Sequence, residues 1–197
     1  KNGTSVSISY GKITSLSLDP IEKKPLARFF PRSRILSVGS FGCNMDCPFC
    51  QNSTISNAGI NDVKTKHLPP YELAALAQEL KERGNIGVAY TYNEPMIGYE
   101  YVRDTAIQVK KRGMKNAVVT NGAFTSETLR EILDYVDAYN IDLKCFTKEG
   151  YKKLGGNLDI VLEFIQTAAA HAHVEITTLI VPGFNDTKEE MDKLSSW

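Results

Sequence analysis

From residue 35 onward, short β-rich runs alternate with longer amphipathic runs, and this alternation limits what the chain can fold into more than any other feature. The predicted strands are residues 35–40, 86–91, 116–120, 138–143 and 174–181. Between them, apolar residues recur at helical spacing at residues 73–80, 99–109, 129–136 and 158–165. A final helix is expected after Asp186, where Thr187 and Glu190 have the spacing of a capping box. Strands that alternate with helices pair as a parallel sheet through right-handed crossovers, so the pattern predicts an α/β fold.

The length of the chain limits how this sheet closes. A closed barrel of eight strands takes about 200 to 250 residues, whereas this chain has 197. We therefore predict that residues 35–197 form an open or partial TIM-like barrel core, with five strands visible and the C-terminal end incomplete. Apolar residues alternate over residues 4–18, so residues 1–34 are expected to form an N-terminal β-hairpin extension, or two edge strands, packed on this core.

The chemistry of a parallel α/β protein gathers at the carboxyl ends of its strands. Here Cys43, Cys47 and Cys50 lie within eight positions, directly after the first predicted strand. Cysteine thiolates hold iron–sulfur clusters, usually four of them, so a loop with three leaves one iron of a 4Fe–4S cluster free for another ligand. A zinc knuckle, a pair of disulfides or ordinary buried thiols are the alternatives. A closed zinc site takes four ligands, and the histidines of this chain are isolated from the loop.

Polar motifs also follow the later strands. Residues 91–95 read Thr-Tyr-Asn-Glu-Pro, and residues 120–122 read Thr-Asn-Gly, which places short donors and acceptors beside a glycine that permits positive φ. Asp142 and Lys144 point to one face of the fourth strand, where an acid and a base together can hold a zwitterionic amino acid. Simple turns and a strand-end ion pair are the alternative interpretations.

In these motifs the chain resembles the radical SAM superfamily, whose signature is this cysteine spacing with an aromatic residue before the last cysteine. Phe49 fills the aromatic position. The resemblance implies a partial (β/α)6 barrel, with a sixth strand after Trp197. It also implies that Cys43, Cys47 and Cys50 hold a 4Fe–4S cluster and that Phe49 lies beside the adenine of S-adenosyl-L-methionine.

The later motifs resemble one group within the superfamily. The tripeptides at residues 120–122 and 142–144 are similar to those of the pyruvate formate-lyase activating enzymes. Residues 19–26 and 91–95 look most like the radical SAM member of the AmmeMemoRadiSam system. The Gly-Gly-Glu-Pro motif of the superfamily is replaced here by Tyr-Asn-Glu-Pro. The resemblance implies that S-adenosylmethionine is bound by Asn93, Glu94, Thr120, Asn121, Asp142, Lys144 and Pro182.

The activity implied by this resemblance is that of an oxidoreductase: reductive cleavage of S-adenosylmethionine to a 5′-deoxyadenosyl radical that abstracts hydrogen from a substrate. A low-potential donor such as flavodoxin or ferredoxin would supply the electron, and on the activating-enzyme analogy the substrate is a glycine of a partner protein. A small molecule or a different macromolecule is the alternative substrate. A non-catalytic iron–sulfur electron carrier is a remote alternative, because a carrier has no use for the polar residues at the strand ends.

Composition narrows the classes of partner and the cellular location that we expect. Acidic and basic residues are equal at 23 each, which gives no indication of a nucleic-acid partner. No apolar run approaches the roughly 20 residues of a membrane span, and no signal peptide follows the first residue. Clustered thiols are typical of a reducing compartment, so we expect a cytoplasmic protein without membrane association.

Overall fold

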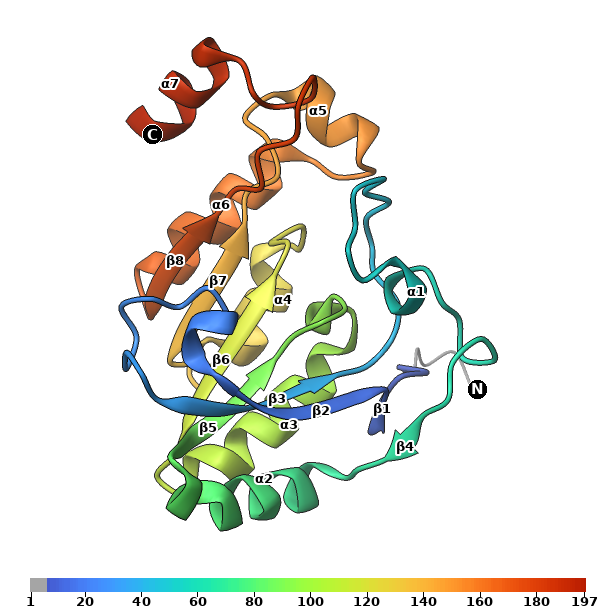
Figure 1. Ribbon diagram of the computed structural model, residues 1–197, viewed down its shortest axis with the longest axis vertical. Helices are drawn as coiled ribbons and strands as arrows, with labels where there is room; N and C mark the ends of the chain where they lie inside the picture. The colour runs from blue at the N-terminus through green and yellow to red at the C-terminus, as the bar shows by residue number, and fades with distance from the viewer. Residues whose placement is uncertain (1–6) are drawn as a thin grey trace.

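A six-stranded sheet carries the fold, with its strands in the order β2-β3-β5-β6-β7-β8 (Figure 1). The computed structural model describes residues 7–197. The strands are β2 (Ser15–Pro20), β3 (Arg34–Gly39), β5 (Asn85–Tyr90), β6 (Lys115–Thr120), β7 (Ala138–Asp142) and β8 (His173–Thr177). Neighbours from β3 to β8 are parallel, whereas β2 is antiparallel to β3. The prediction of an α/β fold with a partial barrel is confirmed.

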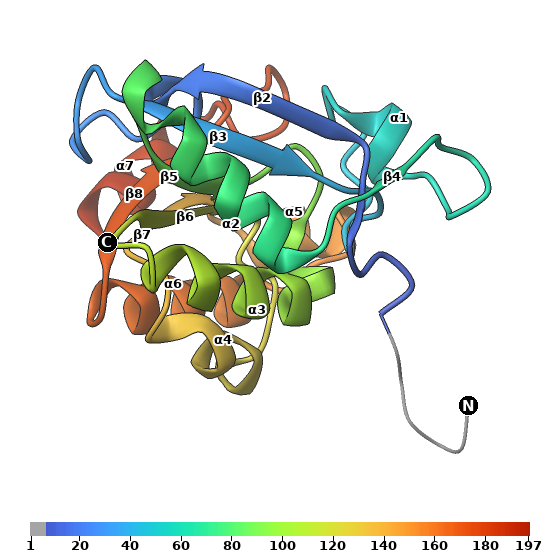
Figure 2. The same cartoon turned by 90° about the horizontal axis from the view of Figure 1, so that it is seen from below.

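Four helices cover the outer face of the sheet (Figure 2). They are α2 (Pro70–Glu79), α3 (Tyr99–Lys110), α4 (Ser126–Leu133) and α6 (Leu158–Ala169), as the apolar spacing predicted. Their buried residues pack against the outward side chains of the strands, such as Val88, Val118 and Ile141. Shorter helices are α1 (Ser53–Ser56), α5 (Lys148–Lys153), α7 (Lys188–Ser196), η1 (Ile21–Lys23), η2 (Leu80–Arg83) and η3 (Pro95–Gly98). No helix within residues 7–197 is long and apolar enough to cross a membrane.

Of the two alternatives predicted for residues 4–18, a hairpin or two edge strands, the described residues form edge strands and no hairpin of their own. The short strand β1 (Lys12–Ile13) pairs with β4 (Lys66–His67), and β2 pairs with β3 to form the hairpin instead. Residues 4–6, which belong to the same prediction, lie outside the described residues. Pairing with β2 satisfies the backbone groups of β3, which would otherwise lie at the exposed edge of the parallel sheet.

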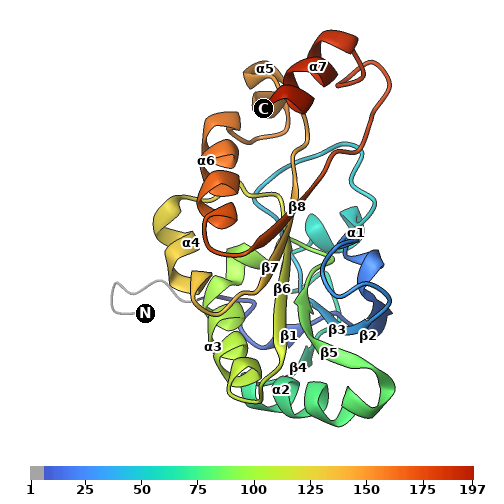
Figure 3. The same ribbon diagram turned by 90° about the vertical axis from the view of Figure 1, so that its left-hand side faces the viewer.

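The chain between β2 and β3, residues 21–33, crosses the inner face of the sheet, on the side opposite the helices (Figure 3). We call it the connector. It buries Ile21, Leu26 and Phe29 against the inner face, where three neighbouring strands each place an alanine: Ala89, Ala117 and Ala138. Small side chains at these positions leave the space that the connector fills. The connector therefore covers the part of the inner face around these three alanines.

Two polar side chains of the sheet hold the connector in place. The Asn140 amide donates a hydrogen bond to the carbonyl oxygen of Pro25 at 3.0 Å. The Glu175 carboxylate accepts hydrogen bonds from the backbone N–H groups of Ala27 and Arg28 at 2.8 and 2.9 Å. Both residues lie on the last two strands, so the connector spans the sheet from one edge to the other.

The last strand and the last helix differ in detail from the prediction. Strand β8 ends at Thr177 rather than at residue 181, because the Asn185 side chain accepts from Val181 N and donates to the carbonyl of Leu179 and so draws this segment into a turn. The Thr187 hydroxyl caps α7 by accepting from Glu190 N, as predicted. The Glu190 carboxylate does not return to complete a capping box, and it accepts instead from the backbone N–H of Phe146.

Candidate cofactor site

A cavity of about 540 Å³ lies at the carboxyl ends of the strands. All but one of the residues predicted for the site line it: Cys43, Cys47, Phe49, Cys50, Asn93, Glu94, Thr120, Asn121, Asp142 and Lys144. The exception is Pro182, which lies on an exposed turn after β8, while Leu179 of the same loop lines the cavity. Phe184 of that turn lies beside Phe49, with 5.5 Å between the ring centroids. The fold thus brings together motifs from five separate loops.

The three thiols of the cysteine loop all face this cavity, and each of them is free. Burial raises the pKa of Cys43, and burial raises that of Cys47 to about 11. The Cys43 sulfur accepts hydrogen bonds from Met45 N at 3.4 Å and from Asn121 Nδ2 at 3.6 Å. Such donors stabilise negative charge on sulfur and influence the reduction potential of iron–sulfur clusters.

The donor set of the cavity is that of an iron–sulfur cluster with one open iron. Within residues 7–197, no group of three or more His, Cys, Asp or Glu side chains is arranged to hold one metal ion. A 4Fe–4S cluster does not need its ligands to meet at one point, because each cysteine binds a different iron. Cys43, Cys47 and Cys50 supply three soft sulfur donors that line one cavity, which is the donor chemistry of such a cluster. The fourth thiol, Cys145, is fully buried elsewhere and lies against Gly150.

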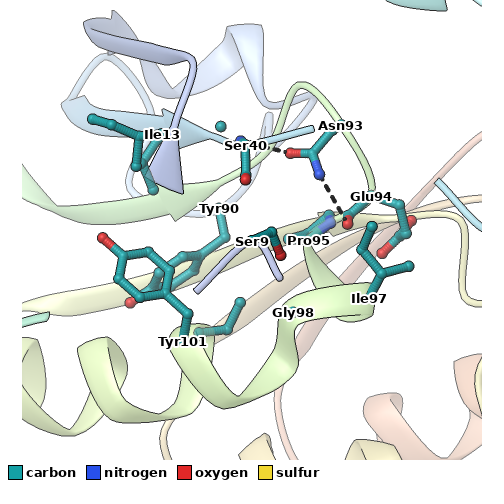
Figure 4. Close-up of a pocket in the computed structure, with 13 residues that line it drawn as sticks. Ser9, Ile13, Ser40, Tyr90, Asn93, Glu94, Pro95, Ile97, Gly98 and Tyr101 are labelled. Carbon is teal, nitrogen blue, oxygen red and sulfur yellow. Dashed lines mark hydrogen bonds between the residues drawn. The ribbon is translucent and has the colours of Figure 1, made fainter. Parts of the chain in front are cut away.

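Asn93 connects the turn after β5 to the start of the cysteine loop (Figure 4). Its Oδ1 accepts from Ser40 N at 2.8 Å, and its Nδ2 lies 3.1 to 3.2 Å from the carbonyl oxygens of Phe41, Gly42 and Glu94. The side-chain amide is therefore fully used by backbone groups. Asn93 positions the cysteine loop, and its backbone is what remains to face a ligand.

Glu94 joins the turn after β5 to the turn after β6. Its carboxylate accepts from the Thr120 hydroxyl at 2.7 Å, from Met96 N at 3.0 Å and from Asn121 N at 2.8 Å. Burial raises the pKa of Glu94 to about 7 although these donors lower it. Behind this turn, a second cavity of about 30 Å³ has room for one water molecule and is bordered by Ser9 and Tyr101 (Figure 4).

Asp142 and Lys144 form an ion pair of 2.6 Å at the end of β7. Burial by itself would lower the pKa of Lys144, but the neighbouring Asp142 carboxylate outweighs burial and the pKa is raised. Lys144 is therefore a cation beside an anion on one wall of the cavity. This is the pairing that a ligand with both an amino and a carboxylate group needs.

Several residues in and around the cavity were not predicted from the sequence. Asn44 exchanges hydrogen bonds with the turn after β6, accepting from Asn121 Nδ2 at 2.8 Å and donating to the carbonyl of Ala123 at 2.9 Å. Lys23, Lys24 and Pro25 of the connector also line the cavity. Nothing in the local sequence indicates these contacts, because they join residues far apart along the chain.

Comparison with known proteins agrees with this geometry. The family model described as "Radical SAM superfamily" matches residues 37–197. The chain belongs to the radical SAM superfamily. The family implies a 4Fe–4S cluster and S-adenosylmethionine as cofactors.

Relatives within the superfamily include proteins with named activities. The chain is 39% identical over 193 residues to protein MJ0808 of Methanocaldococcus jannaschii, covering 96% of this chain and 56% of that protein. It is 28% identical over 161 residues to pyruvate formate-lyase 1-activating enzyme of Escherichia coli K12, covering 79% of this chain and 65% of that enzyme. It is 23% identical over 160 residues to 4-hydroxyphenylacetate decarboxylase activating enzyme of Clostridioides difficile, covering 77% of this chain and 51% of that enzyme. The chain thus spans about half to two thirds of these relatives, and it is homologous to glycyl-radical activating enzymes at modest identity.

Solved radical SAM structures share the fold. Streptococcus suis SuiB bound to S-adenosylmethionine aligns with a TM-score of 0.59 at 15% identity, covering 82% of this chain and 36% of that one. Methylornithine synthase (PylB) aligns with a TM-score of 0.58 at 18% identity, covering 86% of this chain and 52% of that one. At these identities the likeness concerns the partial barrel alone.

Proposed function

We propose that this radical SAM enzyme reductively cleaves S-adenosylmethionine and uses the product radical to abstract hydrogen from a glycine of a partner protein. The observation that supports this most is the meeting of three free thiols with the Asp142–Lys144 ion pair in one cavity. When bound, the cluster and S-adenosylmethionine supply the electron transfer and the 5′-deoxyadenosyl radical. The protein binds and orients both groups.

Each part of the cavity has a role in this proposal. Cys43, Cys47 and Cys50 hold the cluster and leave one iron for the methionyl group. Lys144 and Asp142 bind the charged end of S-adenosylmethionine. Phe49, Thr120 and Asn121 contact its nucleoside or methionyl portions, as do the backbone of Asn93 and the Glu94 turn. No residue beyond the cluster ligands is assigned to the hydrogen transfer itself.

The substrate class rests on similarity to the activating enzymes. A glycine of a partner protein is consistent with a cavity that opens at the carboxyl ends of the strands, and a low-potential protein such as flavodoxin or ferredoxin would donate the electron. The closer assignment to the radical SAM member of the AmmeMemoRadiSam system stays a prediction based on residues 19–26 and 91–95. So does the cytoplasmic location.

An anaerobic assay of S-adenosylmethionine cleavage tests the chemistry. Cluster-loaded protein, given a strong reductant, should convert S-adenosylmethionine into 5′-deoxyadenosine and methionine. Replacing Cys43, Cys47 or Cys50 by Ala should abolish both the visible cluster absorption and the cleavage. Cys145→Ala is the matched control, since this thiol lies outside the cavity, and it should keep both.

Two outcomes would count against the proposal. A loaded cluster that cleaves no S-adenosylmethionine would favour an electron carrier, and cleavage retained by any variant of the three loop cysteines would contradict the ligand assignment. Lys144→Ala should weaken S-adenosylmethionine binding and leave the cluster absorption intact. For the substrate, deuterium transfer from labelled glycine in candidate partner proteins into 5′-deoxyadenosine separates a protein from a small molecule.

A further inference from the structure

Tyr92 has a backbone conformation that tyrosine rarely adopts. Its φ is +74°, and only two other residues besides glycine, Phe30 and Arg32, have positive φ within residues 7–197. This left-handed region is open to glycine at no cost and strains other residues. Tyr92 begins the turn that carries Asn93 and Glu94, so a strained residue lies at the start of a site segment.

Two charged residues from outside the turn hold the Tyr92 side chain. The Tyr92 hydroxyl donates to Asp19 Oδ2 at 2.7 Å. Lys24 Nζ lies 2.8 Å from the same carboxylate oxygen and 4.5 Å from the centre of the Tyr92 ring. Asp19 and Lys24 are only 7% and 2% exposed, so these contacts are shielded from water and strong for their kind.

The sheet is shaped to accept this cluster. A Cβ added to Gly39, at the end of β3, would lie 2.8 to 2.9 Å from atoms of Thr91 and Tyr92, so only glycine leaves room for the ring. Asp19 lies on β2, next to β3, and Lys24 follows η1 in the connector. The cluster of Asp19, Lys24 and Tyr92 thus joins the sheet, the connector and the turn after β5.

We propose that Asp19 and Lys24 hold Tyr92 in its left-handed conformation and thereby fix the turn at residues 92–95 in the shape that S-adenosylmethionine binding requires. This inference rests on the proposed function. Asp19, Lys24 and Tyr92 are positioning residues here, since they act through the backbone of the turn.

The contacts of the turn carry the effect to the rest of the site. Asn93 holds the backbone of residues 40–42, where the cysteine loop begins, and Glu94 holds Thr120 and Asn121. If Tyr92 relaxed to negative φ, the path of the chain into Asn93 and Glu94 would change. Both neighbouring loops would then lose a partner, although no side chain that faces the ligand had been altered.

A pair of substitutions at one position separates this role from others. Tyr92→Ala and Tyr92→Gly both remove the side chain that Asp19 and Lys24 hold, and both leave that buried ion pair intact. Only glycine adopts the left-handed conformation without strain. In cluster-loaded protein, Tyr92→Ala should weaken S-adenosylmethionine affinity by about tenfold, as the size of that strain predicts. Tyr92→Gly should stay within about threefold of the wild type.

The metal-free protein gives a second readout that needs no cofactor. Tyr92→Gly should unfold at a higher temperature than Tyr92→Ala, the reverse of the usual order for these residues. If Tyr92→Ala fails to fold and Tyr92→Gly folds, the order is the same. Arg32 is the control, because it has φ of +66° but is exposed on the connector and does not line the cavity. Arg32→Ala and Arg32→Gly should differ in stability and not in S-adenosylmethionine affinity.

The outcomes that overturn the inference are specific. Equal loss of affinity in Tyr92→Ala and Tyr92→Gly would mean that the tyrosine side chain acts on the ligand directly, and no loss in either would mean that the turn needs no support. If the wild type binds no S-adenosylmethionine, the proposed function fails, and the unfolding order still decides whether the cluster holds the turn.

Discussion

Glu94 shows how a single buried residue can organise a site. Its side chain is held by three hydrogen-bond donors rather than by a cation, and the residue is 4% exposed. Burial of a carboxylate disfavours its charged form, which is why the pKa rises to about 7. The same carboxylate fixes Thr120 and the backbone of Asn121, whose side chain reaches the Cys43 sulfur. Glu94 thus influences the cysteine loop through its neighbours.

This raised pKa predicts a pH dependence of stability. The folded pKa, about 7, lies above the ordinary value of 4.5, so the folded state binds the proton more tightly than the unfolded state. Stability should therefore fall as pH rises between those two values, by roughly 3 kcal/mol in total. The full stabilisation is present below pH 4.5. Glu94→Gln should be less stable than the wild type at all pH values, because its amide N–H₂ group would face the N–H and O–H donors that now bind the carboxylate. The stability of this variant should also lack the pH dependence that Glu94 contributes.

Urea unfolding of the metal-free wild type and of Glu94→Gln across this pH window measures the difference. Other titrating groups are common to both proteins and cancel in the comparison. A constant difference in the free energy of unfolding would contradict the assignment of the raised pKa to Glu94.

At the scale of elements, the connector determines which part of the sheet is open. Alanines on the inner sides of β5, β6 and β7 make room for it, and the larger residues on the outer sides of the same strands pack against helices. Asn140 and Glu175 then fix its path over the last two strands. As a result, Lys24 reaches both the cavity and Tyr92.

A larger residue beneath the connector should displace it. Ala117→Leu adds volume to the packed inner face and should destabilise the protein by about 1 to 3 kcal/mol. Trypsin should then cleave the connector faster, after Lys23 or Arg28. Val118→Leu is the matched control, because Val118 is buried on the same strand but faces the helices, so it should lower stability without faster cleavage of the connector. Equal cleavage in the two variants would show that the inner face does not retain the connector.

At the scale of the whole molecule, the site exists only where five loops meet. Each loop follows a different parallel strand, so residues from position 43 to position 179 line one cavity. A ligand in this cavity touches several loops at once and should slow their opening together.

Hydrogen exchange of cluster-loaded protein tests that expectation. S-adenosylmethionine should protect backbone amides in residues 43–50, 91–95, 120–123 and 142–145 in the same concentration range. Helix α2, on the outer face, should show no change. Lys144→Ala should shift protection in all four segments to higher concentration, and protection confined to one segment would argue against a shared site.

Much of the fold could be predicted from local sequence. The positions of α2, α3, α4 and α6 and of the five parallel strands follow from the spacing of apolar residues. The threonine cap of α7 follows from a spacing of three residues. The cysteine spacing and the strand-end motifs carried the family resemblance. All but one of the site residues that this resemblance implied line the cavity. These features depend on neighbours within a few residues, and the sequence records such neighbours directly.

Other features were decided only by the tertiary structure. The pairing of β2 with β3, the crossing of the inner face by the connector, and the bonds from Asn44 and Asn93 to distant backbone groups join segments far apart in the chain. The left-handed backbone of Tyr92 depends on Asp19 and Lys24, more than 60 residues earlier. Sequence by itself therefore determined which elements form and which chemistry they carry. The packing of the sheet determined which side chains are free to face the cavity and which ones support the loops, because that depends on how completely the donors and acceptors of each side chain are already used.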